Sequence, residues 1–345
     1  MVTSFQNFLL TEGIKSRDKK PKVLLIMLEG IWDITNKDLA PLKKIANVDF
    51  VQVKSMSEEQ LAKKCENYDY LMLNMDFLPF PDPNKMEKLT EKFYASPYIS
   101  QLKGINVDMT DADFFSPKLA REKNITIQDS PNTTTESVAE SAVTQILLHA
   151  RNRHLAYTDE LKNKKVQCRK SLNLKGKTAG IIGYGNIGKR VSQILHGLGM
   201  NTLIYDIKNT DIKSTPIEKI FKTADVITIH IPAHLPKEQQ TDTHTTNIGF
   251  INSKLLNLCK GTILINLATD IIVDIKAMKQ ALKSGKIIGY SVEPGREMTN
   301  SLKKYDNVHI SPCSYDSDES RNNIKKVWID NMISMIEGNP KNVWN

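Results

Sequence analysis

The chain has 345 residues, of which 40% are hydrophobic and 25% charged, a composition that excludes a disordered chain and is typical of globular proteins. This length exceeds what one hydrophobic core usually supports, so two domains are expected. The net charge is +8, but the basic residues are not interleaved with base-stacking aromatics, which predicts no nucleic-acid partner. The apolar runs are far shorter than the roughly 20 residues of a spanning helix, which predicts no membrane partner.

The four cysteines provide neither a disulfide framework nor a metal site, because no two of them form a Cys-x-x-Cys pair. Residues 1–20 form a polar leader that lacks the apolar core of a signal peptide. Together these features predict a reduced, cytoplasmic protein without a bound metal.

The first predicted elements alternate between strands and helices. A continuous apolar run at 23–28 predicts a strand buried on both faces of a parallel sheet. Further strands are predicted at 50–53 and 70–74, with helical segments at 39–46 and 58–65 and a proline-rich loop at 79–83. This order is typical of a wound α/β domain.

A long helix is predicted to begin near Ser137 and to reach about Leu161, because apolar residues recur there at three- and four-residue spacing. The alternation then resumes. Strands are expected at 178–182, 201–205, 226–231, 262–266, 287–290 and 308–311, and helices from 186, at 217–221, around 275–282 and at 321–336.

The strongest functional motif is a Gly-x-Gly-x-x-Gly sequence that follows an apolar strand and opens a helix. Gly183 permits the tight turn, Gly185 lets a pyrophosphate approach the backbone, and Gly188 lets the helix pack on the strand. Asn186 and Ile187 begin the helix, whose free N–H groups and positive dipole end favour phosphate. The motif predicts dinucleotide binding; the alternative is a tight turn without a ligand.

Asp206 ends the next strand, 18 residues after Gly188. A carboxylate at this position accepts hydrogen bonds from an adenosine ribose and repels a 2′-phosphate. We therefore expect NAD rather than NADP as the cofactor, although the nearby Lys208 weakens that preference.

Several stretches resemble the D-2-hydroxyacid dehydrogenase family, which includes phosphoglycerate and formate dehydrogenases. They are 137–140, 174–183, 224–232, 264–266, 273–274 and 307–312; the first hundred residues match only in rhythm. The resemblance implies an α/β fold of two wound parallel-sheet domains. A Rossmann NAD-binding domain at 131–316 would be inserted in a flavodoxin-like substrate domain at 21–130 and 317–345. It also implies a homodimer and a small-molecule substrate.

In that family an arginine grips the substrate's carboxylate, a histidine transfers the proton and a glutamate orients the histidine. Carried over by position, the arginine falls at Thr269 and the histidine at Cys313. The glutamate falls at Met298, with Glu297 adjacent. Thr269, Glu297 and Cys313 are therefore the candidate catalytic residues, and an ordinary 2-hydroxyacid dehydrogenase site is not expected. For Cys313 we favour a small buried hydrophobe over a reactive thiol.

The resemblance also implies cofactor contacts for Thr135, His230, Pro232, Leu267, Ala268 and Glu293. The family's substrate loop carries a Gly-x-Gly before an aspartate, which corresponds to Gly104, Asn106 and Asp108, so its second glycine has become an asparagine. The cofactor half thus matches the family, whereas the substrate half departs from it.

Two functions remain open. The first is an NAD-dependent oxidoreductase that acts on a CH–OH group, with an altered substrate site and a small carbonyl or hydroxy metabolite as substrate. The second is a non-catalytic NAD(H)-binding protein that serves as a sensor or scaffold. Non-redox chemistry with transiently used NAD is a weaker third possibility.

Overall fold

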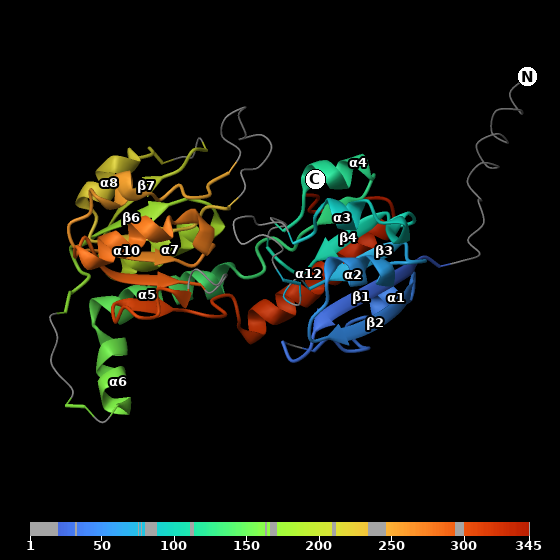
Figure 1. Ribbon diagram of the computed structural model, residues 1–345, viewed down its shortest axis with the longest axis horizontal. Helices are drawn as coiled ribbons and strands as arrows, with labels where there is room; N and C mark the ends of the chain where they lie inside the picture. Colours follow the sequence, from blue (N-terminus) through green and yellow to red (C-terminus); the bar gives the residue numbers. More distant parts are fainter. Residues whose placement is uncertain are drawn as a thin grey trace, which may run out of the picture. The chain divides into compact units, whose positions relative to one another are not determined.

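A computed structural model describes residues 20–31, 33–74, 76, 78–79, 88–110, 114–162, 164–165, 171–208, 212–233, 246–293 and 300–344. Their contacts divide the chain into two compact units. Unit 1 comprises the described residues up to Pro131 and from Asn322 onward, and unit 2 comprises those of Asn132–Arg321. Figure 1 shows the elements of both units along the chain. Glu297 lies outside the described residues.

Unit 1 is built on a five-stranded parallel sheet in the order β2-β1-β3-β4-β5, the order of flavodoxin-like folds. Its strands are β1 (Lys22–Leu28), β2 (Asn47–Val53), β3 (Tyr70–Leu73), β4 (Gly104–Val107) and β5 (Thr126–Gln128). Its helices are α1 (Ala40–Lys43), α2 (Glu58–Lys64), α3 (Glu91–Tyr94), the 3-10 helix η2 (Pro97–Ile99) and α4 (Pro117–Glu122). Most of α12 (Asp318–Ile336) completes the unit.

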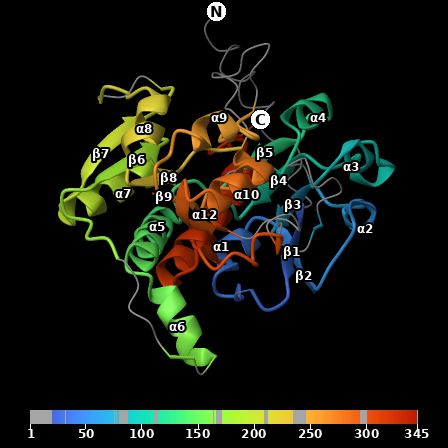
Figure 2. The ribbon, with the colours of Figure 1, turned by 60° about the vertical axis from the view of Figure 1, so that its left-hand side comes forward.

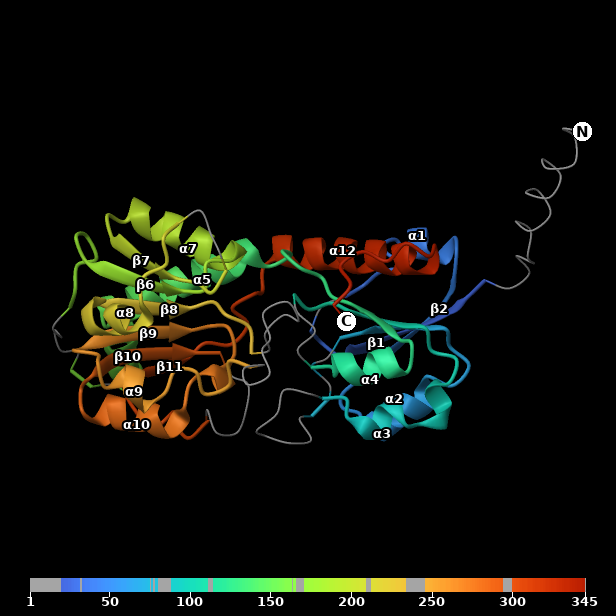
Figure 3. The same ribbon diagram turned by 90° about the horizontal axis from the view of Figure 1, so that it is seen from above.

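Alternate residues of β1 enter the two cores of unit 1, as expected for a strand covered on both faces. Leu25 packs with Leu42 and Trp328, whereas Leu24 packs with Leu61 and other residues of the opposite layer. Figure 3 shows α1 and α12 on one side of this sheet and α2, α3 and α4 on the other.

Unit 2 is built on a six-stranded parallel sheet in the order β11-β10-β9-β8-β6-β7. Its strands are β6 (Thr178–Ile182), β7 (Asn201–Tyr205), β8 (Val226–Ile229), β9 (Thr262–Asn266), β10 (Ile287–Val292) and β11 (Val308–Ile310). Its helices are α5 (Thr135–Ala150), α6 (Arg153–Leu161), α7 (Asn186–Gly197), α8 (Ile217–Thr223), α9 (Ser253–Leu256), the 3-10 helix η4 (Asp270–Ile272) and α10 (Ile275–Lys283). Two wound parallel sheets were predicted, and this fold class is confirmed.

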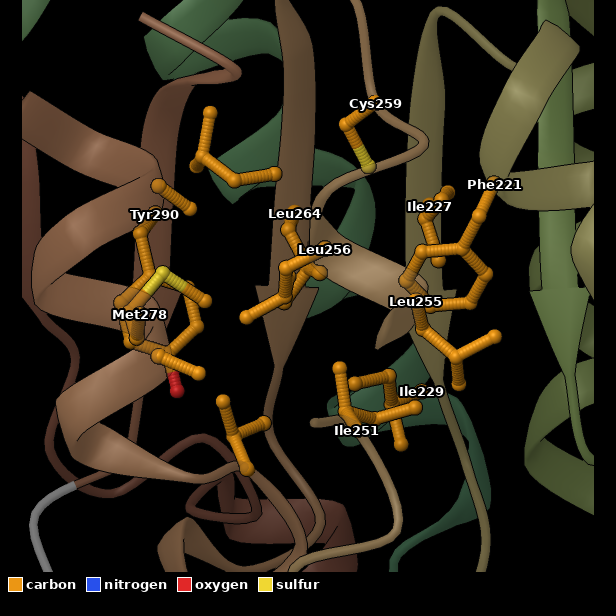
Figure 4. Packing of buried hydrophobic residues seen from close by; sticks show 14 of the residues in the cluster. Phe221, Ile227, Ile229, Ile251, Leu255, Leu256, Cys259, Leu264, Met278 and Tyr290 are labelled. Atoms are coloured by element: carbon orange, nitrogen blue, oxygen red, sulfur yellow. The ribbon is translucent and has the colours of Figure 1, made fainter. Parts of the chain in front are cut away.

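One core of unit 2 packs α8, α9 and α10 against the sheet, where Phe221, Leu255, Leu264, Met278 and Tyr290 are all buried; Figure 4 shows this packing. The other core joins α5 and α7 to the same strands.

The prediction of one long helix up to Leu161 is wrong. α5 ends at Ala150 and α6 begins at Arg153, with Asn152 between them at φ +50°. Asparagine tolerates this left-handed conformation better than most residues, and the chain changes direction there. Among the helices of the described ranges, none is long and apolar enough to cross a membrane.

Candidate functional site

The glycine loop joins β6 to α7 and contains two tightly packed glycines. Gly183 has φ +93°, and a Cβ there would lie 2.3 Å from the His230 carbonyl oxygen. A Cβ on Gly188 would lie 2.0 Å from the Gly183 carbonyl oxygen. Both positions therefore require glycine for packing, which agrees with the roles expected for a tight turn and for close helix–strand contact.

Gly185 is different, because a Cβ there would meet no atom within 4 Å. It is the N-cap of α7, with φ −74° and ψ −160° and without a side-chain cap. The first N–H groups of α7, including those of the exposed Asn186 and the half-buried Ile187, thus face no capping side chain. The open space beside a helix N-terminus forms a cradle of the kind that binds phosphate.

The carboxylate of Asp206 is held at the end of β7 beside this loop. Its Oδ2 accepts the N–H of Tyr184 at 2.5 Å, and its Oδ1 accepts the N–H of Lys208 at 2.7 Å. The glycine loop and the acidic residue are therefore fixed to one another by a direct hydrogen bond. Open cradle, helix N-terminus and fixed carboxylate together fit an adenine dinucleotide.

Helices α5 and α7 meet at the same edge of unit 2. Thr135 begins α5 and is half-buried. The Asn186 side chain donates to Asn132, and Glu136 pairs with Arg190 at 2.7 Å. The contacts of Asn132 and Glu136 therefore hold the first turn of α5, which contains Thr135, beside the first turns of α7 at the carboxyl edge of the sheet.

His230 follows β8. Its Nε2 lies 2.9 Å from Thr228 Oγ1, and burial lowers the pKa of the imidazole to about 3. The ring is therefore neutral at physiological pH. Pro232 lies two residues further on, and its carbonyl accepts the side-chain N–H of Asn247 at 2.8 Å.

The turn after β9 is held by Asn266, which is fully buried. Its side chain donates to the Thr269 carbonyl at 2.7 Å and accepts the Ala268 N–H at 3.3 Å. Leu267 is buried, Ala268 is exposed and Thr269 is half-buried. Thr269, the position at which the family resemblance predicts the arginine, thus carries a short neutral hydroxyl.

The segments after β10 and β11 are joined by Glu293 and Ser314. The Glu293 carboxylate accepts both the N–H and the hydroxyl of Ser314. Cys313, the residue before Ser314, is exposed and has φ +57°. The interpretation of Cys313 as a small buried hydrophobe is wrong, because the left-handed turn directs the chain so that this residue faces solvent while Ser314 is buried.

The segment that the family resemblance assigns to the substrate loop forms part of strand β4 in unit 1. Asn106 lies inside β4 with no exposed surface, and its Nδ2 donates to the Trp328 carbonyl at 2.6 Å. The Trp328 indole N–H donates back to the Asn106 carbonyl at 2.9 Å. Asn106 therefore ties β4 to α12, a task that its sequence motif did not indicate.

Asp108 follows β4 and is buried, with Oδ2 accepting Asn74 Nδ2 at 2.8 Å. Burial raises its pKa to about 7; the Asn74 hydrogen bond opposes this rise and the charge of Asp76 adds to it. Neither Asn74 nor Ser314 was predicted from the sequence. For Asn74 the available signal was a polar residue directly after an apolar strand, where parallel sheets place their ligands.

Much of unit 2 is similar in sequence to a known NAD-binding domain. Residues 143–313 match the family model for the NAD binding domain of D-isomer specific 2-hydroxyacid dehydrogenases. A hydroxypyruvate reductase from Thermotoga maritima is 30% identical over 222 residues, which are 61% of this chain and 67% of that protein. The chain belongs to this family.

Other relatives extend the likeness. D-3-phosphoglycerate dehydrogenase from Haemophilus influenzae is 28% identical over 311 residues, covering 85% of this chain and 69% of that enzyme. Among solved structures, an acyclic imino acid reductase in complex with NADPH and D-Arg superposes with a TM-score of 0.76 at 21% identity, over 93% of this chain and 99% of that one. That second likeness establishes the fold alone. The chain thus contains the NAD-binding domain of this oxidoreductase family and has the two-domain fold of its members.

Proposed function

We propose that this protein is an NAD-dependent oxidoreductase that interconverts a hydroxyl and a carbonyl group on a small metabolite, with a substrate site altered from that of its family. The observation that carries the proposal is the open cradle at Gly185 with the Asp206 carboxylate fixed beside it. Bound NAD supplies or accepts the hydride. The side chains at the carboxyl ends of β9, β10 and β11 orient the substrate and move its proton.

The preference for NAD over NADP rests on Asp206. A 2′-phosphate would bring its negative charge toward this carboxylate, whose oxygens are already held by two backbone N–H groups. Calorimetric titration with NADH and NADPH tests the preference, with Asp206→Ser as the variant, since serine still accepts a hydrogen bond. NADH should bind more tightly to the native protein, and the variant should lose most of that difference. Equal affinities in the native protein would place the ribose elsewhere.

The altered substrate site rests on Thr269 and Cys313. A neutral hydroxyl cannot supply the charged fork of an arginine, and losing one charge-assisted hydrogen bond typically costs about 1.5–3 kcal/mol. Losing the proton-transferring imidazole typically slows a reaction by about 10²–10⁴-fold. We therefore expect negligible turnover of D-lactate, D-glycerate, 3-phosphoglycerate, formate and their oxo partners.

A double variant separates a changed specificity from lost activity. Thr269→Arg with Cys313→His should recover reduction of pyruvate, glyoxylate or hydroxypyruvate only if the rest of the site still suits a carboxylate. We expect no recovery, because the buried Asp270 follows Thr269 directly and would pair with the new guanidinium. Each single variant is the matched control, and NADH affinity is measured first. Robust reduction by the double variant would show that only two side chains separate this protein from an ordinary dehydrogenase.

The second candidate function, a non-catalytic NAD(H)-binding protein, is favoured by the same two replacements. It predicts tight NADH binding without NADH oxidation across a broad panel of aldehydes, ketones and imines. Turnover of any panel member that depends on Thr269 or Cys313 excludes it.

We also propose a homodimer that forms through unit 2. The support is α6, which exposes Tyr157 by 62% and Leu161 by 66%, an apolar surface that a second copy could cover. Light scattering after size exclusion tests this, and Tyr157→Glu with Leu161→Glu should shift the mass from dimer to monomer. A monomeric native protein at micromolar concentration would contradict it.

A further inference from the structure

Ser314 forms hydrogen bonds through three different atoms in the turn that follows β11. Its hydroxyl and its N–H both donate to the Glu293 carboxylate, the N–H at a longer 3.4 Å. Its carbonyl accepts the hydroxyl of Ser141 on α5 at 2.8 Å. Because Ser314 is only 3% exposed, water competes little for these bonds. The turn is therefore held to α5 on one side and to Glu293 on the other.

Ser141 belongs to a polar stripe on α5. Ser137, Ser141 and Gln145 follow one another at four-residue spacing, so they lie on one face of the helix. Ser137 donates to Ser317 at 2.9 Å, and Gln145 donates to Ser311 at 2.9 Å. The segment that carries Ser314 is thus bound to α5 at three successive turns of the helix, and its position does not depend on a bound ligand.

The backbone of Glu293 is fixed as well. Glu293 directly follows β10, and its N–H donates to the Asn266 carbonyl at the end of β9 at 3.2 Å. A long glutamate side chain is flexible when it is unrestrained, but the Ser314 hydroxyl holds this one beside the ends of β10 and β11. A carboxylate offers about four acceptor positions, so it can accept the two Ser314 donors and a donor of a ligand together.

The strand order indicates which end of the proposed cofactor would reach Glu293. The glycine loop follows β6, and Asp206 follows the neighbouring β7 on one side of it. With the adenosine ribose at Asp206, the nicotinamide half extends the other way, across the ends of β8, β9 and β10. Figures 2 and 3 both show β7, β6, β8 and β9 in this order across the sheet. Glu293 lies at the end of that path.

The nicotinamide half of the cofactor carries a carboxamide, whose NH₂ group is a double hydrogen-bond donor. A carboxylate only accepts, and it forms a charge-assisted hydrogen bond with such a donor. We propose that Ser314, itself held by Ser141, is a positioning residue that keeps the Glu293 carboxylate turned toward the carboxamide of the bound nicotinamide. This inference rests on the proposed function and adds the residue that orients the cofactor's reactive end.

Two effects of different size are expected. A hydrogen bond to a charged group contributes about 10- to 100-fold to affinity. Holding one flexible side chain in place before the ligand binds contributes about 2- to 10-fold. Removal of the Ser314 hydroxyl should therefore cost only the smaller factor, whereas removal of the Glu293 carboxylate should cost the whole of the larger one.

Calorimetric titration of the full chain with three ligands tests the proposal. Reduced acetylpyridine adenine dinucleotide has a methyl group in place of the carboxamide nitrogen, and ADP-ribose lacks the nicotinamide. The native protein should bind NADH about 10- to 100-fold more tightly than the acetylpyridine analogue. Ser314→Ala should lower this ratio by about 2- to 10-fold and leave the ADP-ribose affinity unchanged. Glu293→Ala should bring the ratio close to one, and adding Ser314→Ala to it should change the ratio no further.

Ser317→Ala is the matched control, because Ser317 lies in the same segment and its hydroxyl bonds to Ser137 of α5; it should keep the native ratio. Ser314→Thr retains a hydroxyl and should keep most of it. A role in stability alone would weaken the binding of NADH and of the analogue equally. If Ser314→Ala does not fold, Ser141→Ala removes the bond to the Ser314 carbonyl and should also lower the ratio.

A native ratio near one, with ADP-ribose bound, would overturn the positioning role and leave the proposed cofactor intact. The same conclusion would follow if Ser314→Ala left the ratio unchanged or if Ser317→Ala lowered it equally. Failure of both NADH and ADP-ribose to bind would refute the proposed function, and this inference with it.

Discussion

Replacing Gly185 with alanine should weaken cofactor binding strongly and leave the fold intact. The backbone there has φ −74° and ψ −160°, which alanine adopts freely, and the new methyl group meets no protein atom within 4 Å. Alanine lowers the conformational entropy of the unfolded chain, which stabilises the fold by about 0.4–1 kcal/mol. Alanine is also a poorer N-cap than glycine, which destabilises α7. These effects oppose each other, so the free energy of unfolding should change by less than about 1 kcal/mol.

The effect on binding should be much larger, because the methyl group would fill the cradle at the N-terminus of α7. Keeping a pyrophosphate out of reach of two backbone N–H groups would remove two charge-assisted hydrogen bonds, each of about 1.5–3 kcal/mol. That loss corresponds to roughly 10²–10⁴-fold in Kd. NADH titration by calorimetry, together with thermal unfolding, measures both quantities on one preparation.

Gly188→Ala is the matched control in the same loop. Its Cβ would lie 2.0 Å from the Gly183 carbonyl oxygen, so the helix must shift, at a cost of about 1–3 kcal/mol. Stability and affinity should therefore fall together, with Tm lower by about 2–4 °C for each kcal/mol in a domain of this size. Native NADH affinity in a folded Gly185→Ala protein would refute the assignment of the cradle to the cofactor.

Two predictions concern unit 1. Because burial raises the pKa of Asp108 to about 7, the folded state holds this proton more tightly than the unfolded state, and stability falls as pH rises from about 4 to 7. Asp108→Asn should add up to about 4 kcal/mol at pH 8 and little at pH 4 in urea unfolding; an equal change at both pH values would contradict this. Asn106→Ala should cost about 1–3 kcal/mol by removing the buried hydrogen bond from the Asn106 side chain to the Trp328 carbonyl, and a fall in NADH affinity with unchanged stability would contradict its structural role.

The fold was largely predictable because its strands are apolar runs. Strands buried on both faces must be almost wholly apolar, so runs such as 23–28 and 262–266 were recognisable without a partner strand. The break at Asn152 was not, since the helical spacing continues past it and only the backbone conformation reveals the end of α5. Likewise, β5 was not predicted, because its three residues are too few to show a hydrophobic periodicity.

In the candidate site, too, some residues could be predicted from the sequence and others could not. Gly183 and Gly188 were recognisable because a side chain at either position would collide with backbone atoms, so only glycine fits there. Asn106 could not be placed by its motif, since a side chain's burial in a strand depends on which face α12 covers. The exposure of Cys313 depends on one positive φ angle, which the sequence does not encode in any recognisable pattern for cysteine.

These two kinds of constraint bear on the proposed alteration of the substrate site, because the fold limits replacements in the cofactor loop more than replacements at Thr269 and Cys313. A side chain at Gly183 or Gly188 would collide with the backbone of unit 2 itself, so the loop is held by folding as well as by its ligand. Thr269 is only half-buried and Cys313 is exposed, and the turns that carry them are fixed by Asn266 and by the Glu293–Ser314 pair instead. Replacement of the two end-of-strand residues therefore costs the fold little. Under the proposed function, cofactor affinity and substrate range are separate properties of this protein, so NADH binding has to be measured before any absence of turnover is interpreted.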